Sequence, residues 1–262
     1  MGNPYGCNND LSSPYDISRL TFKEIEQEIN RFPALVLPLG GCEPYGSGMP
    51  LGLPSRCSEA IALALSCRRR MLMAPALQYG CSTSFSAFGG TTGIKPRTLM
   101  NLLCEILRQF SRQGIRFVVI IDPLMDNGPA LDEAKRRVTG SDRNLHIILI
   151  RLQQDERIVS FVRRRWGFPT GGRNEGVMRA LGAFAGLNAA QSQNCGKKAI
   201  PTGWEERYRT WRRRGGDPQQ LRKLFPEGCT EEAGGADDPE IGREIFEYIG
   251  AIIDESLAPL HQ

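Results

Sequence analysis

The sequence predicts an α/β fold, a single-domain three-layer α/β/α sandwich with a mainly parallel sheet. Helical and strand patterns alternate along the 262 residues without a repeat or a domain-scale linker, which is typical of βαβ units. Segments 35–39 and 117–121 are apolar throughout, as strands buried on both faces are. A chain of this length can bury roughly three quarters of its unfolded surface. We expect an irregular arm over residues 1–16 and the α/β domain over residues 17–262.

Composition places the chain among ordinary globular proteins. Its 40% hydrophobic and 24% charged residues are typical values, and a net charge of +4 does not by itself indicate a nucleic-acid partner. No apolar run approaches the ~20 residues that cross a bilayer. Residues 1–7 have neither the basic nor the apolar region of a signal peptide. We therefore expect a cytoplasmic protein with no membrane or nucleic-acid partner.

The first half of the chain predicts two helices and two strands. Thr21 begins a capping-box spacing, and the apolar residues after it fall on one helical face, so a helix is expected up to Pro33. The first apolar strand follows it directly. Segment 55–67 has a helical pattern that ends in a run of arginines, which suits the negative end of a helix dipole. Segment 71–77 is short and apolar and is expected to be a strand.

The second half continues the alternation. Pro96 opens a helix with one clean leucine-rich stripe, which stops at Gly114. The second apolar strand follows, then a short helix near 129–138 and a strand over 145–152. The last helix is expected to begin at Pro239, because an aspartate precedes it and isoleucines recur at helical spacing after it.

The region between the fourth strand and the last helix is less regular. Residues 153–187 are expected to be helical in parts, and residues 188–238 are rich in glycine and polar side chains. Two arginine runs, 163–166 and 211–214, each include a tryptophan, a pattern that can bind nucleic acid. Neighbouring acids and the small net charge favour a solvated face or a subunit contact instead. Trp211 can cover a pocket or bury an interface.

Cysteine and histidine usage limits the chemistry. The eight cysteines include no C-x-x-C pair, so we expect thiols, several of them buried, and no soft-metal site. Only two histidines are present, His146 in a predicted strand and His261 in the tail. Cys42 and Cys81 lie in loops, but neither has a histidine near it in sequence, which disfavours a cysteine nucleophile.

Three loops carry the candidate functional residues. In a parallel sheet, ligands bind beyond the carboxyl ends of the strands, which selects the segments 40–54, 79–93 and 122–128. Their glycines and prolines fix the backbone, and their polar residues are the candidates. These residues are Glu43, Tyr45, Ser82, Ser84, Thr91, Asp122, Asp126 and Asn127.

The same loops resemble those of the creatininase family of metal-dependent amidohydrolases. Residues 37–52 read Leu-Pro-Leu-Gly-Gly-Cys-Glu-Pro-Tyr-Gly-Ser-Gly-Met-Pro-Leu-Gly, which is similar to the family's opening signature. Residues 79–82 and 88–91 look like its second loop, and residues 117–127 look like its later strand and turn. Residues 171–175 are weakly similar to a family segment that contains a glutamate, and residues 235–249 resemble the family's closing Gly-Asp-Pro stretch and final helix.

The resemblance implies two divalent ions, but few of their ligands are present. Glu43 matches the first ligand, and Asp126 matches an acid after the later strand. The remaining positions, four histidines and one shared aspartate in the family, carry other residues: Tyr45, Gly48, Pro54, Phe85 and Leu124. Two-metal hydrolysis needs imidazoles and a bridging carboxylate to hold the ions about 3.5–4 Å apart. We therefore expect no cofactor and no hydrolysis.

The main hypothesis is a non-hydrolytic binding or scaffold subunit with a degenerate metal site. A small-molecule ligand would contact the loop residues Tyr45, Ser82, Thr91, Asp122 and Asn127. By resemblance, the chain is expected to assemble as a homo-oligomer, a hexamer in the family, or together with an active homologue.

The alternative is an amidohydrolase with an unusual carboxylate-rich site. Glu43 and Asp126, with Asp122 and Glu175 nearby, would bind Zn²⁺, Mn²⁺ or Mg²⁺ through oxygen atoms. Glu175 would be the catalytic residue, and the substrate would be the C–N bond of a cyclic amide or formamide.

Overall fold

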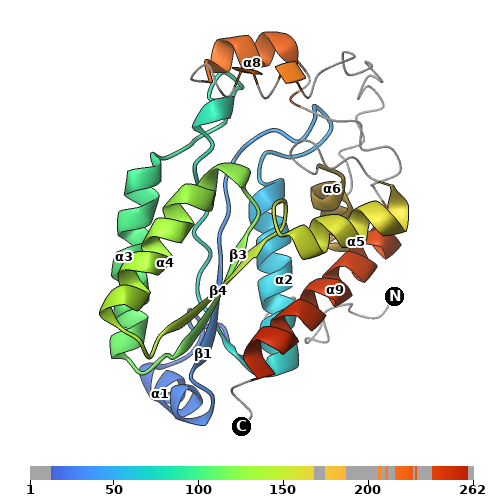
Figure 1. The fold of residues 1–262 in the computed structure, drawn as a ribbon. Helices are drawn as coiled ribbons and strands as arrows, with labels where there is room; N and C mark the ends of the chain where they lie inside the picture. Colours follow the sequence, from blue (N-terminus) through green and yellow to red (C-terminus); the bar gives the residue numbers. More distant parts are fainter. Residues whose placement is uncertain are drawn as a thin grey trace.

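The computed structural model describes residues 13–167, 175–186, 206–207, 210–211, 216–226, 228 and 238–258. Within them, four strands form one sheet in the order β2-β1-β3-β4 (Figure 1). The strands are β1 (Ala34–Pro38), β2 (Leu72–Met73), β3 (Phe117–Asp122) and β4 (His146–Arg151). Every neighbouring pair is parallel, so the predicted parallel α/β fold is confirmed.

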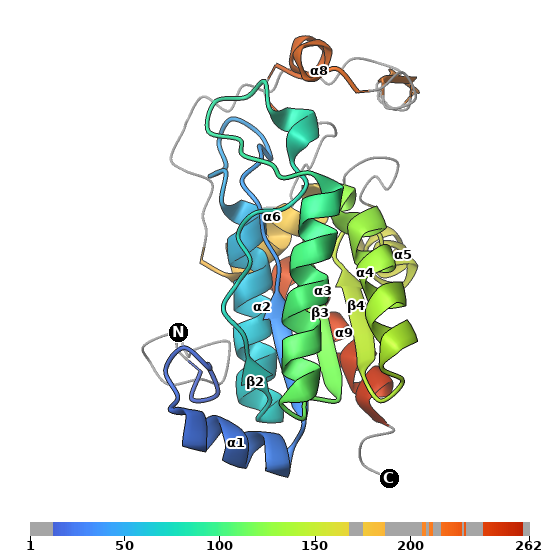
Figure 2. The same ribbon diagram turned by 90° about the vertical axis from the view of Figure 1, so that its left-hand side faces the viewer.

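Helices cover both faces of the sheet (Figures 1 and 2). Helices α3 and α4 bury one face, together with α1, and helices α2, α5, α6 and α9 bury the other. The described helices are α1 (Phe22–Arg31), α2 (Leu53–Arg69), α3 (Pro96–Arg112), α4 (Gly128–Ser141), α5 (Glu156–Trp166), α6 (Glu175–Phe184), α8 (Pro218–Leu224) and α9 (Pro239–Leu257), with 3₁₀ turns at Thr83–Phe85 and Met125–Asn127.

The continuous apolar strands follow from these two layers. In β1, Val36 packs into the cluster under α2 and α9, whereas Leu35 and Leu37 pack into the cluster under α3 and α4. Successive side chains of a strand point to opposite faces, and each face here is covered. Alternation of polar and apolar residues would therefore place polar groups in a core, which explains why β1 and β3 lack it.

Two elements differ from their predicted extents. The α2 helix begins at Leu53, two residues early, because Pro54 lies in its first turn, where proline needs no backbone donor. Strand β2 contains only Leu72 and Met73, and beyond it pairing is limited to an isolated bridge between Leu39 and Leu77. Pro75 interrupts the ladder between them.

The segment before α1 covers the β2 edge of the sheet. The Met73 N–H donates to the Tyr15 carbonyl at 2.9 Å, and the Ile17 N–H donates to the Met73 carbonyl at 3.0 Å. Ser13 is buried, and its hydroxyl bonds that of Ser66 at 2.6 Å. These residues lie at the expected end of the arm, whose first twelve residues are outside the described part. The division at residues 16 and 17 stays a prediction.

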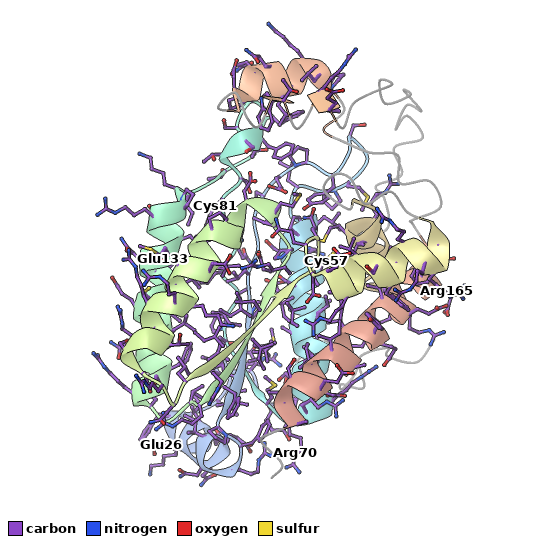
Figure 3. All side chains as sticks on the ribbon, viewed as in Figure 1. Glu26, Cys57, Arg70, Cys81, Glu133 and Arg165 are labelled. Carbon is purple, nitrogen blue, oxygen red and sulfur yellow. The ribbon has the colours of Figure 1, made fainter. Side chains whose placement is uncertain are left out.

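The prediction that the cysteines are thiols is wrong for Cys67, which is disulfide-bonded. Cys42, Cys57, Cys81 and Cys104 are free. Spacing could not show this bond, because a disulfide depends on the approach of two Cβ atoms in the folded chain. Cys57 is fully buried, and its thiol donates to the Met178 carbonyl at 3.4 Å (Figure 3).

Two residues of the first arginine–tryptophan run contact other parts of the same chain. Arg165 pairs with Glu244 of α9 at 3.1 Å and lies over the Trp166 ring. Trp166 meets the edge of Phe161, which stacks on Tyr248 at 4.1 Å. These contacts support a structural role for Arg165 and Trp166. Residues 212–214 of the second run lie outside the described part. Among the described helices, none has the length and apolar character needed to span a bilayer.

Candidate functional site

Four loops meet at the carboxyl edge of the sheet, one after each strand. The three predicted loops follow β1, β2 and β3, and the segment 152–155 after β4 joins them. The loops approach one another closely at glycine residues, where a side chain would not fit. A Cβ atom added to Gly41 would lie 2.6 Å from Leu124 Cδ1, and a Cβ atom added to Gly80 would lie 2.7 Å from the Gly40 carbonyl oxygen. Only glycine permits backbones to approach this closely.

Tyr45 is fully buried and joins three of the loops. Gln153 Nε2 donates to Tyr45 Oη at 2.5 Å and also to the Pro123 carbonyl. The Tyr45 hydroxyl donates to the same carbonyl at 3.4 Å. Gln153 is 3% exposed, so these bonds form in a region that water does not reach. The loops after β1, β3 and β4 are therefore held together by hydrogen bonds.

This arrangement makes a testable prediction about the Tyr45–Gln153 pair. Tyr45→Phe and Gln153→Met are each expected to destabilise the fold by about 1 kcal/mol, because each removes the buried hydrogen bond between the two side chains, although the remaining partner still bonds the Pro123 carbonyl. The double variant should lose less than the sum, with a coupling energy of about 1 kcal/mol. Urea unfolding of the four proteins measures it. Strict additivity would contradict a direct bond between the two side chains.

Asp122 and Asn127 form a second link, between the loops after β2 and β3. Asn127 Nδ2 donates to Asp122 Oδ1 at 2.8 Å, and the Cys81 N–H donates to Asn127 Oδ1 at 2.8 Å. The Leu124 N–H also donates to Asp122 Oδ1, at 3.1 Å. Asp122 Oδ2 is buried and has no hydrogen-bond partner in the described structure. All four residues are buried.

Burial controls the protonation of this link. Burial, with a smaller contribution from the nearby Glu43 carboxylate, raises the pKa of Asp122 from 3.8 to about 7, against the opposing effects of the bonds from Asn127 and Leu124 and of the Arg151 charge. Burial also raises the pKa of the Cys81 thiol to about 12. A thiol that stays protonated is a poor nucleophile, which weakens the cysteine alternative for Cys81.

The other predicted site residues have separate surroundings. Glu43 is 3% exposed, and its N–H donates to the Leu51 carbonyl at 3.1 Å. Asp126 is half-buried, and Ser84 Oγ donates to its Oδ2 at 2.8 Å. The hydroxyls of Ser82 and Thr91 are buried without a hydrogen-bond partner in the described residues.

Glu175 and the two histidines complete the set of candidates. Glu175 is the first residue of α6, and its side chain lies outside the described part. His146 begins β4, at the end of the sheet opposite the loops, where it is exposed and stacks on Phe117 at 4.8 Å. His261 is not among the described residues. Within the described residues, no three His, Cys, Asp or Glu side chains converge as metal ligands do.

The side chain of Leu124 fills the space between the loops. A Cβ on Gly41 or Gly80 would lie within 2.6 Å of Leu124 Cδ1, so the leucine methyl rests on both glycines. Leu124 is 2% exposed. Apolar carbon, rather than a ligand atom, thus occupies the centre of the three predicted loops.

A small apolar cluster joins the loop after β2 to helix α8. Phe85, Trp211, Leu221 and Phe225 are buried together, and Phe88 and Leu224 pack against them. Arg222 of α8 bonds the Ala87 carbonyl and lies over the Phe88 ring. Figure 1 shows α8 beyond the loop end of the sheet. Phe85 thus faces α8, and Trp211, which the sequence suggested as a cover, is buried in this cluster.

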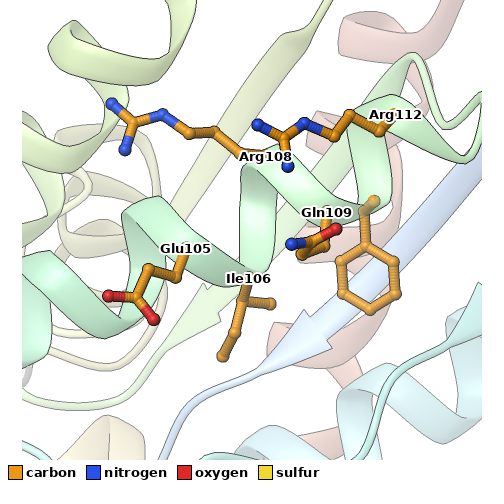
Figure 4. Close-up of a pocket in the computed structure, with 6 residues that line it drawn as sticks. Glu105, Ile106, Arg108, Gln109 and Arg112 are labelled. Atoms are coloured by element: carbon orange, nitrogen blue, oxygen red, sulfur yellow. The ribbon is translucent and has the colours of Figure 1, made fainter.

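Two hollows on the surface are large enough to consider, and only the first includes a residue of a site loop. One of about 740 Å³ runs beside α2, and its lining includes Cys42, Ser55, Arg56 and Glu59 but not Glu43 or Tyr45. Its volume suits a small molecule. The other, of about 650 Å³, is lined by six residues that all come from α3 (Figure 4). It is a hollow along one helix and does not reach the loops.

The likeness to the creatininase family can now be tested on the whole chain. A model of that family, described as creatinine amidohydrolase, matches residues 18–180. The chain belongs to the creatininase family. The match covers β1 to β4 and their loops, and therefore includes every segment of the candidate site except the part after α6.

Creatininase relatives with known names match parts of the chain. A mycofactocin precursor peptide peptidase from Mycobacterium tuberculosis (strain CDC 1551 / Oshkosh) is 33% identical over 98 residues, which are 34% of this chain and 39% of that protein. A creatinine amidohydrolase from Pseudomonas putida is 28% identical over 123 residues, 45% of this chain and 47% of that protein. The chain thus spans less than half the length of these relatives.

Solved creatininase structures share the fold over nearly the full length. A mutant creatininase of the Zn-Zn type has a TM-score of 0.66 and 21% identity, covering 94% of this chain and 98% of that one. In this chain, the Leu124 methyl contacts Gly41 and Gly80 between the loops, and Tyr45 is hydrogen-bonded by Gln153.

Proposed function

We propose that this chain is a creatininase-family scaffold subunit that does not hydrolyse C–N bonds. The observation that supports it is the position of Leu124, whose methyl group rests on Gly41 and Gly80 in the middle of the site loops. By the resemblance, this position carries a metal-binding histidine in the family. A buried leucine there offers no ligand and excludes water, which hydrolysis requires.

In this proposal, hydrogen bonds between the loops replace the metal ions that would otherwise hold the loops together. Metal ligands on several loops would hold those loops together, and here the Tyr45–Gln153 and Asp122–Asn127 bonds do so instead. The tight interior favours a scaffold over a binding role for the predicted ligand contacts, since Tyr45, Ser82, Asp122 and Asn127 are all buried. The hydroxyl of Thr91, the fifth predicted ligand contact, is buried as well. Self-assembly, or assembly with an active homologue, is the function that remains.

A second candidate function rests on Asp122. Its Oδ2 is buried without a hydrogen-bond partner in the described residues, and Glu43 is close enough to raise its pKa. Such an orphaned carboxylate oxygen is what a divalent ion would use. The alternative is therefore an amidohydrolase of a cyclic amide or formamide in which Glu43 and Asp126, together with Asp122, bind the metal and Glu175 is the catalytic residue. The two named relatives are a peptidase and an amidohydrolase, which supports this alternative.

Metal analysis of the purified protein decides between the two. The scaffold proposal predicts far less than one tightly bound divalent ion per chain, and a melting temperature that Zn²⁺ and Mn²⁺ leave unchanged, since a ligand stabilises only the state that binds it. Creatinine and a formylated amine should not be hydrolysed. Glu43→Ala and Asp126→Ala serve as matched controls. About two ions per chain that both variants lose would contradict the proposal and support the alternative.

The location of the protein is a separate proposal. We propose a cytoplasmic location, which is supported by the ordinary globular composition of the chain and by the lack of a membrane-spanning helix among the described residues.

A further inference from the structure

The larger of the two hollows lies between segments that are far apart in the sequence. Its volume is about 740 Å³, and its walls come from the segment before α1, the loop after β1, one side of α2, the segment that begins in β2 and the residue after α6. Figure 2 shows the segment before α1 beside α2. A volume of roughly 300–1,000 Å³ is typical of small-molecule sites. The hollow on α3 is lined by one helix only, so the hollow beside α2 is the better candidate for a ligand site.

Charged side chains of both signs line this hollow, two positive and two negative. They are Asp16, Arg19, Arg56 and Glu59. Asp16 Oδ1 accepts hydrogen bonds from the N–H and the hydroxyl of Ser18, at 2.9 and 2.7 Å. Gln78 Nε2 donates to the Glu59 carboxylate at 3.0 Å. Within the described part of the chain, neither Arg56 nor Asp16 has an ion-pair partner. A charged ligand can therefore bind both without breaking an ion pair of the protein.

Arg56 and Asp16 lie at different levels along α2. Arg56 is near the start of the helix, which begins at Leu53 beside the site loops. Asp16 lies beside the last turns, because its N–H donates to the Ser13 carbonyl at 3.3 Å and the Ser13 hydroxyl bonds that of Ser66. A helix rises 1.5 Å per residue, so Arg56 and Ser66 are about 15 Å apart along the axis. The charged groups of Arg56 and Asp16 are therefore on the order of 15 Å apart.

The lining between these two charges is mainly apolar. Ala60 and Leu63 lie on α2 beyond Arg56, and Met73 and Ala76 come from the segment that begins in β2. All four apolar residues are half-buried, so each keeps some surface in contact with water. Covering that surface with the apolar part of a ligand is favourable. The hollow thus has a cation at one end, a carboxylate at the other and apolar side chains between them.

We propose that this hollow binds an elongated zwitterion, a molecule in which an apolar chain joins a carboxylate to an ammonium group. Arg56 binds the carboxylate, because its planar guanidinium can donate two parallel hydrogen bonds to it. Asp16 binds the ammonium group, and the chain lies on Leu63 and Met73. The two charged hydrogen bonds take about 2.8 Å each, which leaves about 10 Å for the ligand.

Two kinds of molecule have this chemistry. A tripeptide with free ends spans about 10 Å when extended, and an ω-amino acid such as 8-aminooctanoate has a similar reach. The test below distinguishes them. The inference goes beyond the proposed scaffold function, because it uses neither the hydrogen-bonded residues of the site loops nor a metal ion. Metal analysis and the binding experiment can therefore fail separately.

Isothermal titration calorimetry of the full chain with 8-aminooctanoate and with the tripeptide Ala-Leu-Ala tests the proposal. At least one of them should bind about tenfold or more tightly than the matching probes that lack one charge, because each charged contact contributes to affinity. These probes are octanoate, octylamine and the tripeptide with an amidated carboxyl end. Tighter binding of the tripeptide indicates a peptide ligand, and tighter binding of 8-aminooctanoate indicates an aliphatic amino acid.

Two variants assign the ends of the ligand. Arg56→Gln should weaken binding of the zwitterion about tenfold or more and leave that of octylamine unchanged. Asp16→Asn keeps an oxygen acceptor for Ser18, so it should preserve the fold. It should weaken the zwitterion to the same degree and leave octanoate unchanged. Arg108→Gln and Glu105→Gln in the hollow on α3 (Figure 4) are matched controls and should change nothing.

Cys42 reports where the ligand binds. It lines the same hollow and is half-buried, whereas the other free cysteines that the structure describes are buried. Thiol reactivity depends on access of the reagent. A saturating zwitterion should therefore slow the alkylation of Cys42 by iodoacetamide about threefold or more, as measured by mass spectrometry of the peptide that contains it.

Three results would overturn the proposal. The first is that neither zwitterion binds at millimolar concentration, or that neither binds more tightly than the singly charged probes. The second is binding that Arg56→Gln leaves unchanged, or that the α3 controls weaken equally. The third is binding without protection of Cys42, because the ligand would then lie elsewhere. Since Asp16 shapes the turn before α1, Arg56→Gln on the exposed surface of α2 is the decisive variant.

Discussion

Replacing Gly80 by alanine is expected to destabilise the protein by about 2–3 kcal/mol. The new Cβ would lie 2.5 Å from Leu124 Cδ1, 2.7 Å from the Gly40 carbonyl oxygen and 2.9 Å from Asn127 Oδ1. The leucine methyl can rotate away. The carbonyl cannot, because it belongs to the loop after β1, and Asn127 is fixed by bonds to Cys81 and Asp122. The methyl group therefore forces the loops apart, and urea unfolding monitored by circular dichroism measures the loss.

Gly89→Ala in the same loop is the matched control. A Cβ on Gly89 meets no atom within 4 Å, so the change in stability should stay within about 0.5 kcal/mol. Similar losses in both variants would mean that the loop resists any alanine, regardless of contact. A neutral Gly80→Ala would mean that the loops after β1, β2 and β3 do not touch as described.

The layers of the fold could be predicted from local patterns. The apolar runs at 35–39 and 117–121 indicated strands buried on both faces, and the stripe after Pro96 indicated a one-sided helix. These signals are local, because they depend on which faces of an element are covered. The short extent of β2 was not predictable in this way. Its length is set by pairing with β1 and by Pro75, and only the folded register shows where that pairing ends.

The position of the candidate site could be predicted from the sequence, but the contacts between its residues could not. The rule that sites lie beyond the carboxyl ends of strands selected the loops with Glu43 and Asp122. The same rule, applied to the fourth strand, would have included Gln153. A lone glutamine carries no pattern of its own, so it was missed. The role of Leu124 depends on the approach of Gly41 and Gly80, a contact between distant segments that no local pattern reveals.

Asp122→Asn is expected to change how stability depends on pH. The pKa of Asp122 is about 7 in the folded chain and near 3.8 when the chain is unfolded. Between these values the folded state binds more protons, so wild-type stability falls as pH rises from about 4 to about 7, then levels off. Asparagine stays neutral and keeps an oxygen acceptor for Asn127 and Leu124. The variant should match wild type near pH 4 and exceed it at pH 8 by up to about 4 kcal/mol.

Asp122→Ala separates titration from hydrogen bonding. It leaves the donors of Asn127 and Leu124 unpaired, so it should be less stable than wild type at pH 4 by about 1–3 kcal/mol. Parallel pH profiles for wild type and Asp122→Asn would contradict a buried, protonated Asp122.

The same pH profiles also test the metal alternative. A divalent ion bound by Asp122 would favour the carboxylate, so added Mn²⁺ would raise the stability of the wild type at pH 8 and leave that of Asp122→Asn unchanged. If Mn²⁺ has no effect on either protein, the Asp122 carboxyl is a structural hydrogen-bonding group, as the scaffold proposal requires.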